Sequence, residues 1–418
     1  MMPLTYRATK KLVPNKQDTL VRSREEAFKL IADLDKKIAN KQLPRHDRAV
    51  YLCGRAVLYE AIGDRKMLES ALEAYNFSKT AQSAALVAVA YHHFGRMEEA
   101  IEWYERSYKL PHEAGWEIDI GYSGALLFQK DRWPEAWPIV KSLKKRMVYA
   151  LYLNFWDGKP CKEVSVISEG GFGDLIQNSR YLKKVGELCE KVTVYLPPYF
   201  FDTGFVELLR RQPWFPEIEP MLETPKDVPA AGFFDLPAIF NTTPDTIPSY
   251  PQPWVAGTDK NELVQNLNTC FGRTTRPKIG FVWAARAHET PLVEDGIYRS
   301  LTEQQAIRIV QQTSDKIDWI SLQLGKQIPG IWSADIKSWS DTAAIIENLD
   351  AVVCVDTGVM HLAAAMGKPT YVLLSGAVDW KFMLDGDCVW YPSIKTFRNR
   401  DFGFDKAVDE LIEYLNHK

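Results

Sequence analysis

The chain has 418 residues, a length that suits two or three domains better than one compact core. Its 46% hydrophobic and 25% charged residues are ordinary for a folded protein and exclude global disorder. A formal net charge of −3 excludes a whole-protein attraction to nucleic acid or acidic lipid. The first fifty residues are different, with twelve Lys or Arg against six Asp or Glu. We interpret this stretch as a solvated helix face, with a polyanion contact as the alternative.

Nothing in the sequence predicts a membrane protein. No stretch approaches the roughly 20 apolar residues that a membrane-spanning helix needs. Residues 1–14 carry positive charge but lack the apolar segment of a secretory signal. The six cysteines are scattered and include no pair at metal-ligand spacing, which is typical of reduced thiols. We therefore expect a cytoplasmic protein.

Helical repeats occupy the amino-terminal third. Residues 84–107 predict a helix, a turn at Gly95 and a second helix whose apolar positions recur at helical spacing. Weaker copies follow the same plan around Gly63 and around residues 124–137. The pattern resembles tetratricopeptide repeats, and three copies suffice to bury a continuous helical core. We predict an all-α repeat domain over residues 1–147.

The middle of the chain changes to alternating strands and helices. Residues 163–168 and 192–196 predict strands, separated by a helical pattern that begins at Leu175 and runs through Leu188. This alternation is typical of a parallel sheet, so we expect a Rossmann-like domain over residues 160–255. Its last part, residues 242–253, is rich in Pro, Thr and Ser and is interpreted as a linker.

A second α/β series follows, and we expect another Rossmann-like domain over residues 275–400 and a terminal helix over residues 401–418. Predicted strands cover residues 279–283, 319–323, 351–355 and 370–374. Thr302 and Asp341 are predicted to cap two of the helices between them. The fold class is therefore α/β, with two Rossmann-like domains behind a helical-repeat domain.

The strongest candidate site follows the strand at residues 351–355. Asp356, Thr357, Gly358 and His361 form a turn that leads into a helix of small residues. Free backbone N–H groups and the helix dipole favour an anion such as a phosphate at such a place. Thr357 offers a hydroxyl, Gly358 allows close approach, and His361 is placed to donate to a phosphate oxygen. An ordinary strand–turn–helix joint is the alternative.

The segment around this turn resembles the donor-binding half of heptosyltransferase-like (family 9) glycosyltransferases, most closely the bacterial proteins that carry tetratricopeptide repeats. The resemblance rests on Asp341-Thr342-Ala343, Val355-Asp356-Thr357, His361-Leu362-Ala363 and Gly367-Lys368-Pro369, with Asp379-Trp380-Lys381 and Trp390-Tyr391-Pro392 in the tail. It implies the GT-B fold, in which two Rossmann-like domains face each other across the active site. It also implies a nucleotide-sugar donor and inverting transfer.

A second glycine-rich loop precedes the helix predicted in the first α/β domain. It contains Gly170, Gly171, Gly173, Asp174 and Gln177 and resembles the acceptor-side loop of the same family. The resemblance implies that Asp174 is the general base, since a carboxylate held against the acceptor hydroxyl can remove its proton. The alternative is that Asp174 only caps the following helix.

Further donor contacts are predicted nearer to the second domain's first strand. Arg299 is the first candidate for the diphosphate, Arg286 is the second, and Gln323 is a candidate for the nucleotide's base or ribose. The Asp385-Gly386-Asp387 sequence imitates a metal motif but is interpreted as a turn. We expect no cofactor and no metal, since the resemblance implies that helix dipoles and basic side chains replace a metal.

The predicted function is transfer of a sugar from a nucleotide-diphosphate donor to a large acceptor. The acceptor is expected to be a saccharide or a protein, with a modified DNA base as a minority possibility, and the repeats could also join copies of the chain. Two alternatives are a non-catalytic scaffold with a degenerate transferase module and a sugar-nucleotide epimerase.

Overall fold

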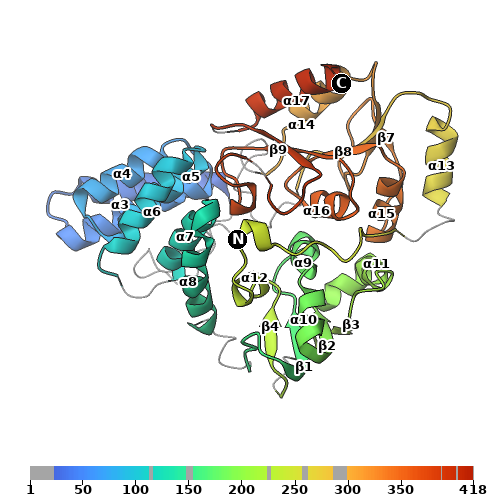
Figure 1. Ribbon diagram of the computed structural model, residues 1–418. Coiled ribbons are helices and arrows are strands. Elements are labelled where there is room, and N and C mark those ends of the chain that lie inside the picture. Colours follow the sequence, from blue (N-terminus) through green and yellow to red (C-terminus); the bar gives the residue numbers. More distant parts are fainter. Residues whose placement is uncertain are drawn as a thin grey trace.

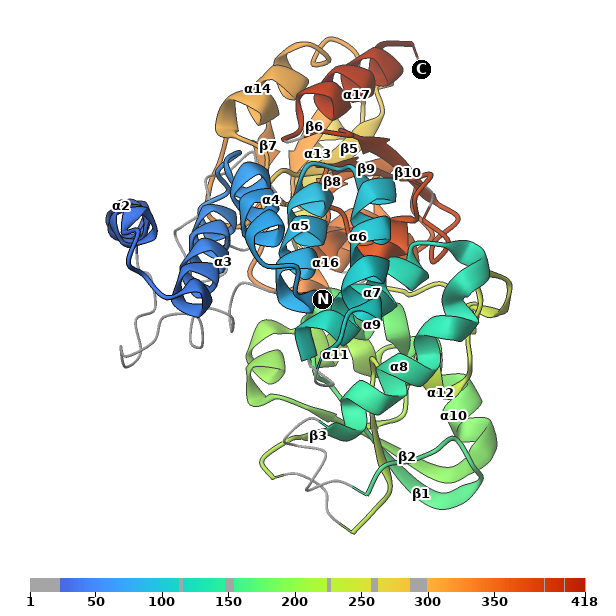
Figure 2. The same ribbon diagram turned by 90° about the vertical axis from the view of Figure 1, so that its left-hand side faces the viewer.

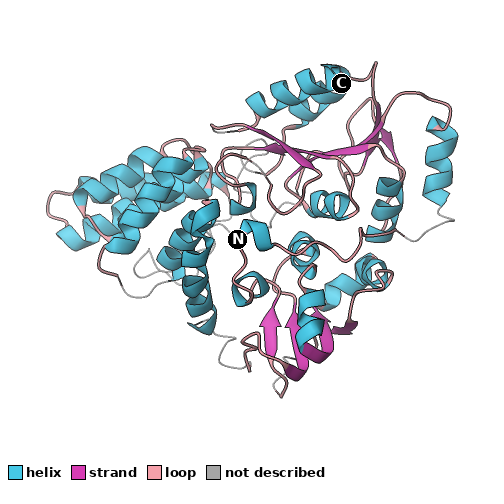
Figure 3. Cartoon of the chain, in the orientation of Figure 1, coloured by secondary structure: helices cyan, strands magenta, loops and turns pink. Residues whose placement is uncertain are grey.

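The computed structural model describes residues 23–112, 116–146, 154–223, 227–256, 262–285, 299–386, 388–401 and 403–417. Figure 1 shows three parts: a helical array, a smaller sheet with its helices, and a larger sheet with its helices. In Figure 3 the two sheets stand apart as separate magenta layers, with helices between them.

The helical array contains α2 (Arg24–Ala39), α3 (Arg45–Ala61), α4 (Met67–Phe77), α5 (Ala81–His93), α6 (Met97–Lys109), α7 (Trp116–Leu127), the 3-10 turn η1 (Lys130–Arg132) and α8 (Trp133–Arg146). Gly63 and Gly95 adopt positive φ angles of 64° and 71° at the turns between paired helices, a conformation that glycine reaches without steric cost. Ala84 and Ala88 are fully buried, and their small side chains let α5 lie close to its neighbours. The predicted repeat turns are confirmed at both glycines.

The first sheet is parallel throughout, with strand order β3-β2-β1-β4. Its strands are β1 (Cys161–Ile167), β2 (Cys189–Leu196), β3 (Glu217–Pro220) and β4 (Ala230–Gly232). The accompanying helices are α9 (Phe172–Ser179), α10 (Leu182–Leu188), η3 (Pro198–Thr203), α11 (Phe205–Arg210), α12 (Leu236–Ile239) and η4 (Pro244–Thr246). The sequence did not predict β3 and β4, which are too short to show a period.

The second sheet is also parallel, with order β10-β9-β8-β5-β6-β7. Its strands are β5 (Lys278–Val282), β6 (Asp318–Ser321), β7 (Trp332–Ser333), β8 (Ala351–Val355), β9 (Thr370–Leu374) and β10 (Ile394–Arg398). The helices are α13 (Glu262–Phe271), α14 (Glu303–Gln311), α15 (Trp339–Glu347), α16 (Gly358–Ala365), η5 (Trp380–Phe382) and α17 (Asp405–His417).

Alternation along each strand of this sheet divides the core into two layers. Val352 and Cys354 of β8 pack in the core that contains α15 and α16, and Val353 and Val355 pack in the core that contains α14 and α17. Both faces are covered, which explains why β8 is apolar throughout and why β9 is apolar after Thr370.

One predicted cap is confirmed and one is wrong. Thr302 accepts the Gln305 N–H and begins α14 as expected. Asp341 is not the N-cap of its helix: Ser338 is, and α15 begins three residues earlier than the sequence indicated. Asp341 completes a capping box from the third helical position, because its carboxylate accepts the Ser338 N–H.

The helical array lies against both α/β units, as Figures 1 and 2 show from two directions. A Cβ atom added at Gly95 would lie 2.9 Å from the Cα of Gly376, so the α5–α6 turn touches the loop after β9. The Trp133 ring of α8 packs on Trp380 and Trp390, and the indole N–H of Trp137 donates to the Thr242 carbonyl. The array therefore contacts the larger unit and the segment that joins the two sheets.

Within the described ranges, no helix has the length and apolar character needed to cross a membrane.

Candidate functional site

The candidate site lies where the strand order of the second sheet reverses. β5 and β8 are neighbours, but the chain leaves them toward opposite sides, to β6 and β7 or to β9 and β10. Ligands of open α/β sheets bind beyond the carboxyl ends of the strands at such a point. Asp356 and Thr357 follow β8 here, and α16 begins at Gly358.

The start of α16 has no side-chain cap. Thr357 is the N-cap residue with an extended backbone, yet its side chain makes no capping hydrogen bond. Its Oγ1 is buried and has no hydrogen-bond partner among the described residues. Burying an unpaired hydroxyl costs about 1–3 kcal/mol, so this atom is poised for a ligand. The free N–H groups of the first turn favour a negatively charged one.

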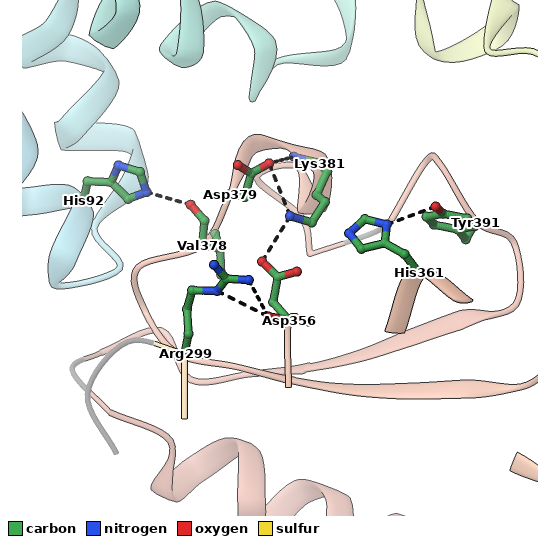
Figure 4. A network of polar contacts seen from close by, with 8 residues as sticks. All are labelled: His92, Arg299, Asp356, His361, Val378, Asp379, Lys381 and Tyr391. Carbon is green, nitrogen blue, oxygen red and sulfur yellow. Dashed lines mark hydrogen bonds and ion pairs between the residues drawn. The ribbon is translucent and has the colours of Figure 1, made fainter. Parts of the chain in front are cut away.

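A buried ionic network anchors Asp356, as Figure 4 shows. Its carboxylate lies 3.0 Å from Lys381 Nζ, and its carbonyl accepts two N–H bonds from Arg299, at 3.2 and 2.7 Å. Lys381 also approaches Asp379 at 3.7 Å. Burial opposes the charge of Asp356, but Lys381 and Arg299 outweigh it and hold the pKa of this carboxyl below its usual range. Burial likewise opposes the charge of Lys381, whose pKa is nevertheless raised by the two aspartates.

In the glycine-rich loop of the first sheet, an acidic side chain caps the helix that follows. α9 begins at Phe172, not at Leu175 as the sequence indicated, and Gly171 is its N-cap. Asp174 therefore lies in the first turn, where its Oδ2 accepts the Gly171 N–H at 2.9 Å. A Cβ added at Gly170 would lie 2.5 Å from the same oxygen. Asp174 is half-buried, so its carboxylate is both a capping group and accessible.

The two loops meet directly. A Cβ added at Gly173 would lie 2.6 Å from His361 Cδ2 and 3.4 Å from the Cα of Gly358. One added at Gly358 would lie 2.7 Å from the Trp339 ring. Glycine at position 173 therefore allows the first turns of α9 and α16 to touch, and glycine at position 358 leaves room for Trp339 of α15. Asp174 and Thr357 belong to these two touching segments, one on each side of the contact.

His361 is buried behind this contact. Its Nδ1 lies 3.0 Å from the hydroxyl of Tyr391, which in turn lies 3.3 Å from the hydroxyl of Tyr250. The Arg180 guanidinium covers both tyrosine rings, at 4.5 Å from Tyr250 and 4.8 Å from Tyr391. Burial, followed by the positive charge of Lys381, lowers the pKa of His361 to about 3, so the ring is neutral at neutral pH.

The remaining predicted residues lie at the edges of the site or elsewhere. Gln323 follows β6, and its Oε1 accepts the Ala284 N–H at 2.9 Å, which ties the ends of β5 and β6 together. Gln177 is buried in α9, and its carbonyl accepts the Arg180 Nε–H. Arg286 lies outside the described residues.

Four residues of the site were not predicted: Lys381, Tyr391, Arg180 and Tyr250. Lys381 and Tyr391 belong to tail motifs that contributed to the family resemblance, and Arg180 follows the glycine-rich loop. That proximity was the available signal. Tyr250 lies in the segment interpreted as a linker, where the sequence carries no sign of a role.

Comparison with known proteins finds a family that resembles the core of this site. The model of glycosyltransferase family 9 (heptosyltransferase) matches residues 338–379, which run from the cap of α15 through β8, α16 and β9. No curated protein matches the sequence.

Several solved structures are similar to the chain. The E. coli heptosyltransferase WaaC with ADP is 11% identical, with 60% of this chain and 99% of that one covered at a TM-score of 0.40. The E. coli ADP-heptose LPS heptosyltransferase II is 15% identical, covering 61% and 98% at 0.41. A mutant O-GlcNAc transferase of Thermobaculum terrenum is 10% identical, covering 94% and 92% at 0.31.

The family match falls on the strand, turn and helix that carry Asp356, Thr357, Gly358 and His361. Residues 338–379 are therefore similar to family 9 glycosyltransferases, in a chain that also has an amino-terminal helical array.

Proposed function

We propose that this protein transfers a sugar from a nucleotide-diphosphate donor to a hydroxyl or similar nucleophile on a large acceptor, with inversion at the anomeric carbon. The observation that carries the proposal is the unpaired, buried hydroxyl of Thr357 at the open start of α16, opposite Asp174. The family match over the same residues supports it.

The diphosphate is proposed to lie against the first turn of α16. Backbone N–H groups, the Thr357 hydroxyl and Arg299 then face its oxygens. When the bond to the sugar breaks, negative charge develops on the leaving diphosphate, and fixed donors stabilise that charge best. In this proposal the helix start and Arg299 supply the positive potential that a metal ion supplies in other sites.

The acceptor is proposed to approach from the α9 side. Asp174 would accept the proton of the acceptor nucleophile while that nucleophile attacks the anomeric carbon from the face opposite the diphosphate. A single displacement of this kind inverts the configuration. The capping bond uses Oδ2, and the half-buried carboxylate keeps a second oxygen for the acceptor.

A large acceptor, saccharide or protein, suits the helical array. Val378 precedes Asp379 of the ionic network, and its carbonyl lies 2.7 Å from Nε2 of His92 in α5. The array thus lies beside the proposed donor side of the site, and Figure 4 shows His92 next to Val378.

A thermal-shift panel of nucleoside diphosphates and nucleotide sugars tests the donor site. A ligand at 100 times its dissociation constant adds about 2.7 kcal/mol to stability. Thr357→Val keeps the shape of the side chain and removes the hydroxyl, so we expect roughly tenfold weaker binding of the bound member, the size of one lost hydrogen bond to a charged group. Thr269→Val, on α13, removes an exposed hydroxyl that bonds within its own helix and is the matched control.

Failure of every panel member to bind would sink the proposal and favour a non-catalytic scaffold. Conversion of the donor into a second nucleotide sugar without any acceptor would favour an epimerase. Slow hydrolysis of the bound nucleotide sugar, lost in Asp174→Asn, would exclude the scaffold.

A further inference from the structure

His361 stands between the two sides of the proposed site. It lies in the second turn of α16 and is 4% exposed. One ring edge, with Nδ1, faces the Tyr391 hydroxyl, as Figure 4 shows. The opposite edge faces α9, since a Cβ added at Gly173 would lie 2.6 Å from Cδ2 and 3.2 Å from Nε2. Among the described residues, Nε2 has no hydrogen-bond partner.

The direction of the hydrogen bonds on the Nδ1 side follows from counting protons. Tyr250 donates its only hydroxyl proton to the Ile176 carbonyl at 2.7 Å, because a carbonyl oxygen can only accept. At its 3.3 Å contact with Tyr391, Tyr250 must then be the acceptor, so Tyr391 donates its proton there. Tyr391 has no second proton and must accept from His361.

The opposite direction is unfavourable. If Tyr391 donated to Nδ1, its oxygen and that of Tyr250 would face each other at 3.3 Å without a proton between them. Such a contact sets two negative partial charges against each other in a buried place.

The ring nitrogen on the other side is therefore the unprotonated one. The groups around His361 favour a single proton on the ring: Lys381, Arg180 and Arg299 are cationic, and only Asp356 opposes them. A neutral imidazole with its proton on Nδ1 offers a lone pair at Nε2.

We propose that Nε2 of His361 accepts a hydrogen bond from a substrate hydroxyl, and that His361 does not donate to the diphosphate. The proposal rests on the proposed function and refines it. A diphosphate oxygen carries no proton to give at this position, whereas a sugar or acceptor alcohol does. His361 thus becomes a residue that recognises an O–H group, on the transferred sugar or on the acceptor, beside the contact of α9 with α16.

Nitrogen-15 NMR of the imidazole rings tests the tautomer without any ligand. The chain has seven histidines, and the His361 signals are assigned by their loss in His361→Asn. We expect a protonated Nδ1 and a pyridine-type Nε2. Tyr250→Phe removes the acceptor for the Tyr391 proton, so Tyr391 becomes free to donate to Nδ1 and the proton should move to Nε2. Tyr391→Phe should abolish the preference. A protonated Nε2 in the unaltered protein would overturn the proposal.

Binding measurements test the hydroxyl contact. His361→Asn keeps an N–H near Tyr391 and removes the acceptor, whereas His361→Gln can place a carbonyl oxygen near the position of Nε2. The probes are UDP-glucose, GDP-mannose and ADP-glucose, each compared with its nucleoside diphosphate. If Nε2 binds a hydroxyl of the donor sugar, the affinity for the nucleotide sugar should fall about tenfold in His361→Asn, and His361→Gln should restore most of it. The affinity for the nucleoside diphosphate should change less than twofold in either variant. If Nε2 instead binds the acceptor hydroxyl, both affinities should stay unchanged in His361→Asn. The rate of nucleotide-sugar hydrolysis should then fall about tenfold, because water takes the place of the acceptor hydroxyl in that reaction.

Two results would overturn this inference alone: equal loss of nucleotide sugar and nucleoside diphosphate in Asn, or no change in affinity and hydrolysis. If no probe binds to the unaltered protein, the proposed function fails, and the inference with it.

Discussion

The starts of α9 and α16 have the same plan and opposite chemistry. Each is an eight-residue helix that follows a parallel strand and begins at glycine-containing sequence. At α9 the carboxylate of Asp174 returns to the Gly171 N–H and supplies the negative charge itself. At α16 the Thr357 side chain caps nothing, while the neighbouring Asp356 carboxylate is engaged by Lys381.

This difference supports the proposed donor and acceptor sides of the site. A helix start that already contains its own carboxylate is a poor receptor for a diphosphate, but in the proposed function its acid faces the acceptor. A helix start whose N–H groups and buried hydroxyl have no partner favours an anion. The predictions that follow alter one side or the contact between the two.

The largest effect is expected from the ionic network on the α16 side. Lys381→Ala leaves Asp356 and Asp379 buried with less compensating charge, which should lower the free energy of unfolding by about 3–5 kcal/mol. Lys130→Ala is the matched control, because its ion pair with Asp385 is exposed and should contribute less than about 1 kcal/mol. Urea unfolding measures both. Equal losses in the two variants would show that the buried pair has no special role.

The contact between the two helices should tolerate no methyl group. Gly173→Ala forces a Cβ against the His361 ring, and overpacking of this kind lowers stability by roughly 1–3 kcal/mol. Gly186→Ala, in the neighbouring α10, meets open space and should raise stability by about 0.5–1 kcal/mol. Thermal unfolding of the pair measures the opposite signs. If Gly173→Ala left the stability unchanged, α9 and α16 would have to be able to move apart freely.

His361 should make stability depend on pH. Its folded pKa is lowered to about 3, whereas an unfolded histidine titrates near about 6.5, so between these values the unfolded chain binds the extra proton. The contribution of His361 is complete above the unfolded value and is lost as the pH falls toward 3. One proton corresponds to about 1.4 kcal/mol per pH unit. The slope of unfolding free energy from pH 6.5 to 4 should therefore be smaller in His361→Gln, and an unchanged slope would contradict a buried neutral ring.

The smallest effect on stability separates the two roles of Asp174. Asp174→Ala removes the cap and should lower stability by about 1 kcal/mol, whereas Asp174→Asn keeps a capping oxygen and should change it by less. Both variants should lose the proposed transfer or hydrolysis, because an amide cannot take a proton. Full activity in Asp174→Asn would reduce this residue to a cap.

The sequence by itself determined the elements that depend on local pattern. β8 and β9 were predicted with the bounds that the structure has, because strands buried on both faces are mostly apolar. The repeat turns were marked by Gly63 and Gly95, since positive φ at a turn selects glycine. The open turn at Thr357 and Gly358 was recognisable because a strand, a turn and a helix are consecutive in the chain. The predicted starts of α15 and α9 were three residues too late. An acidic residue near a helix start can be the N-cap or lie in the first turn, and the sequence alone does not distinguish the two.

Only the tertiary structure decided what each site residue touches. Lys381 forms an ion pair with Asp356, which lies 25 residues earlier in the chain. The hydroxyl of Tyr391 contacts that of Tyr250, which lies 141 residues earlier. The contact with Tyr250 decides which ring nitrogen of His361 carries the proton. That contact exists because the segment between the two sheets folds back onto the site. Pairings of this kind depend on how layers dock, and docking depends on the summed packing of many side chains, not on the spacing of a motif.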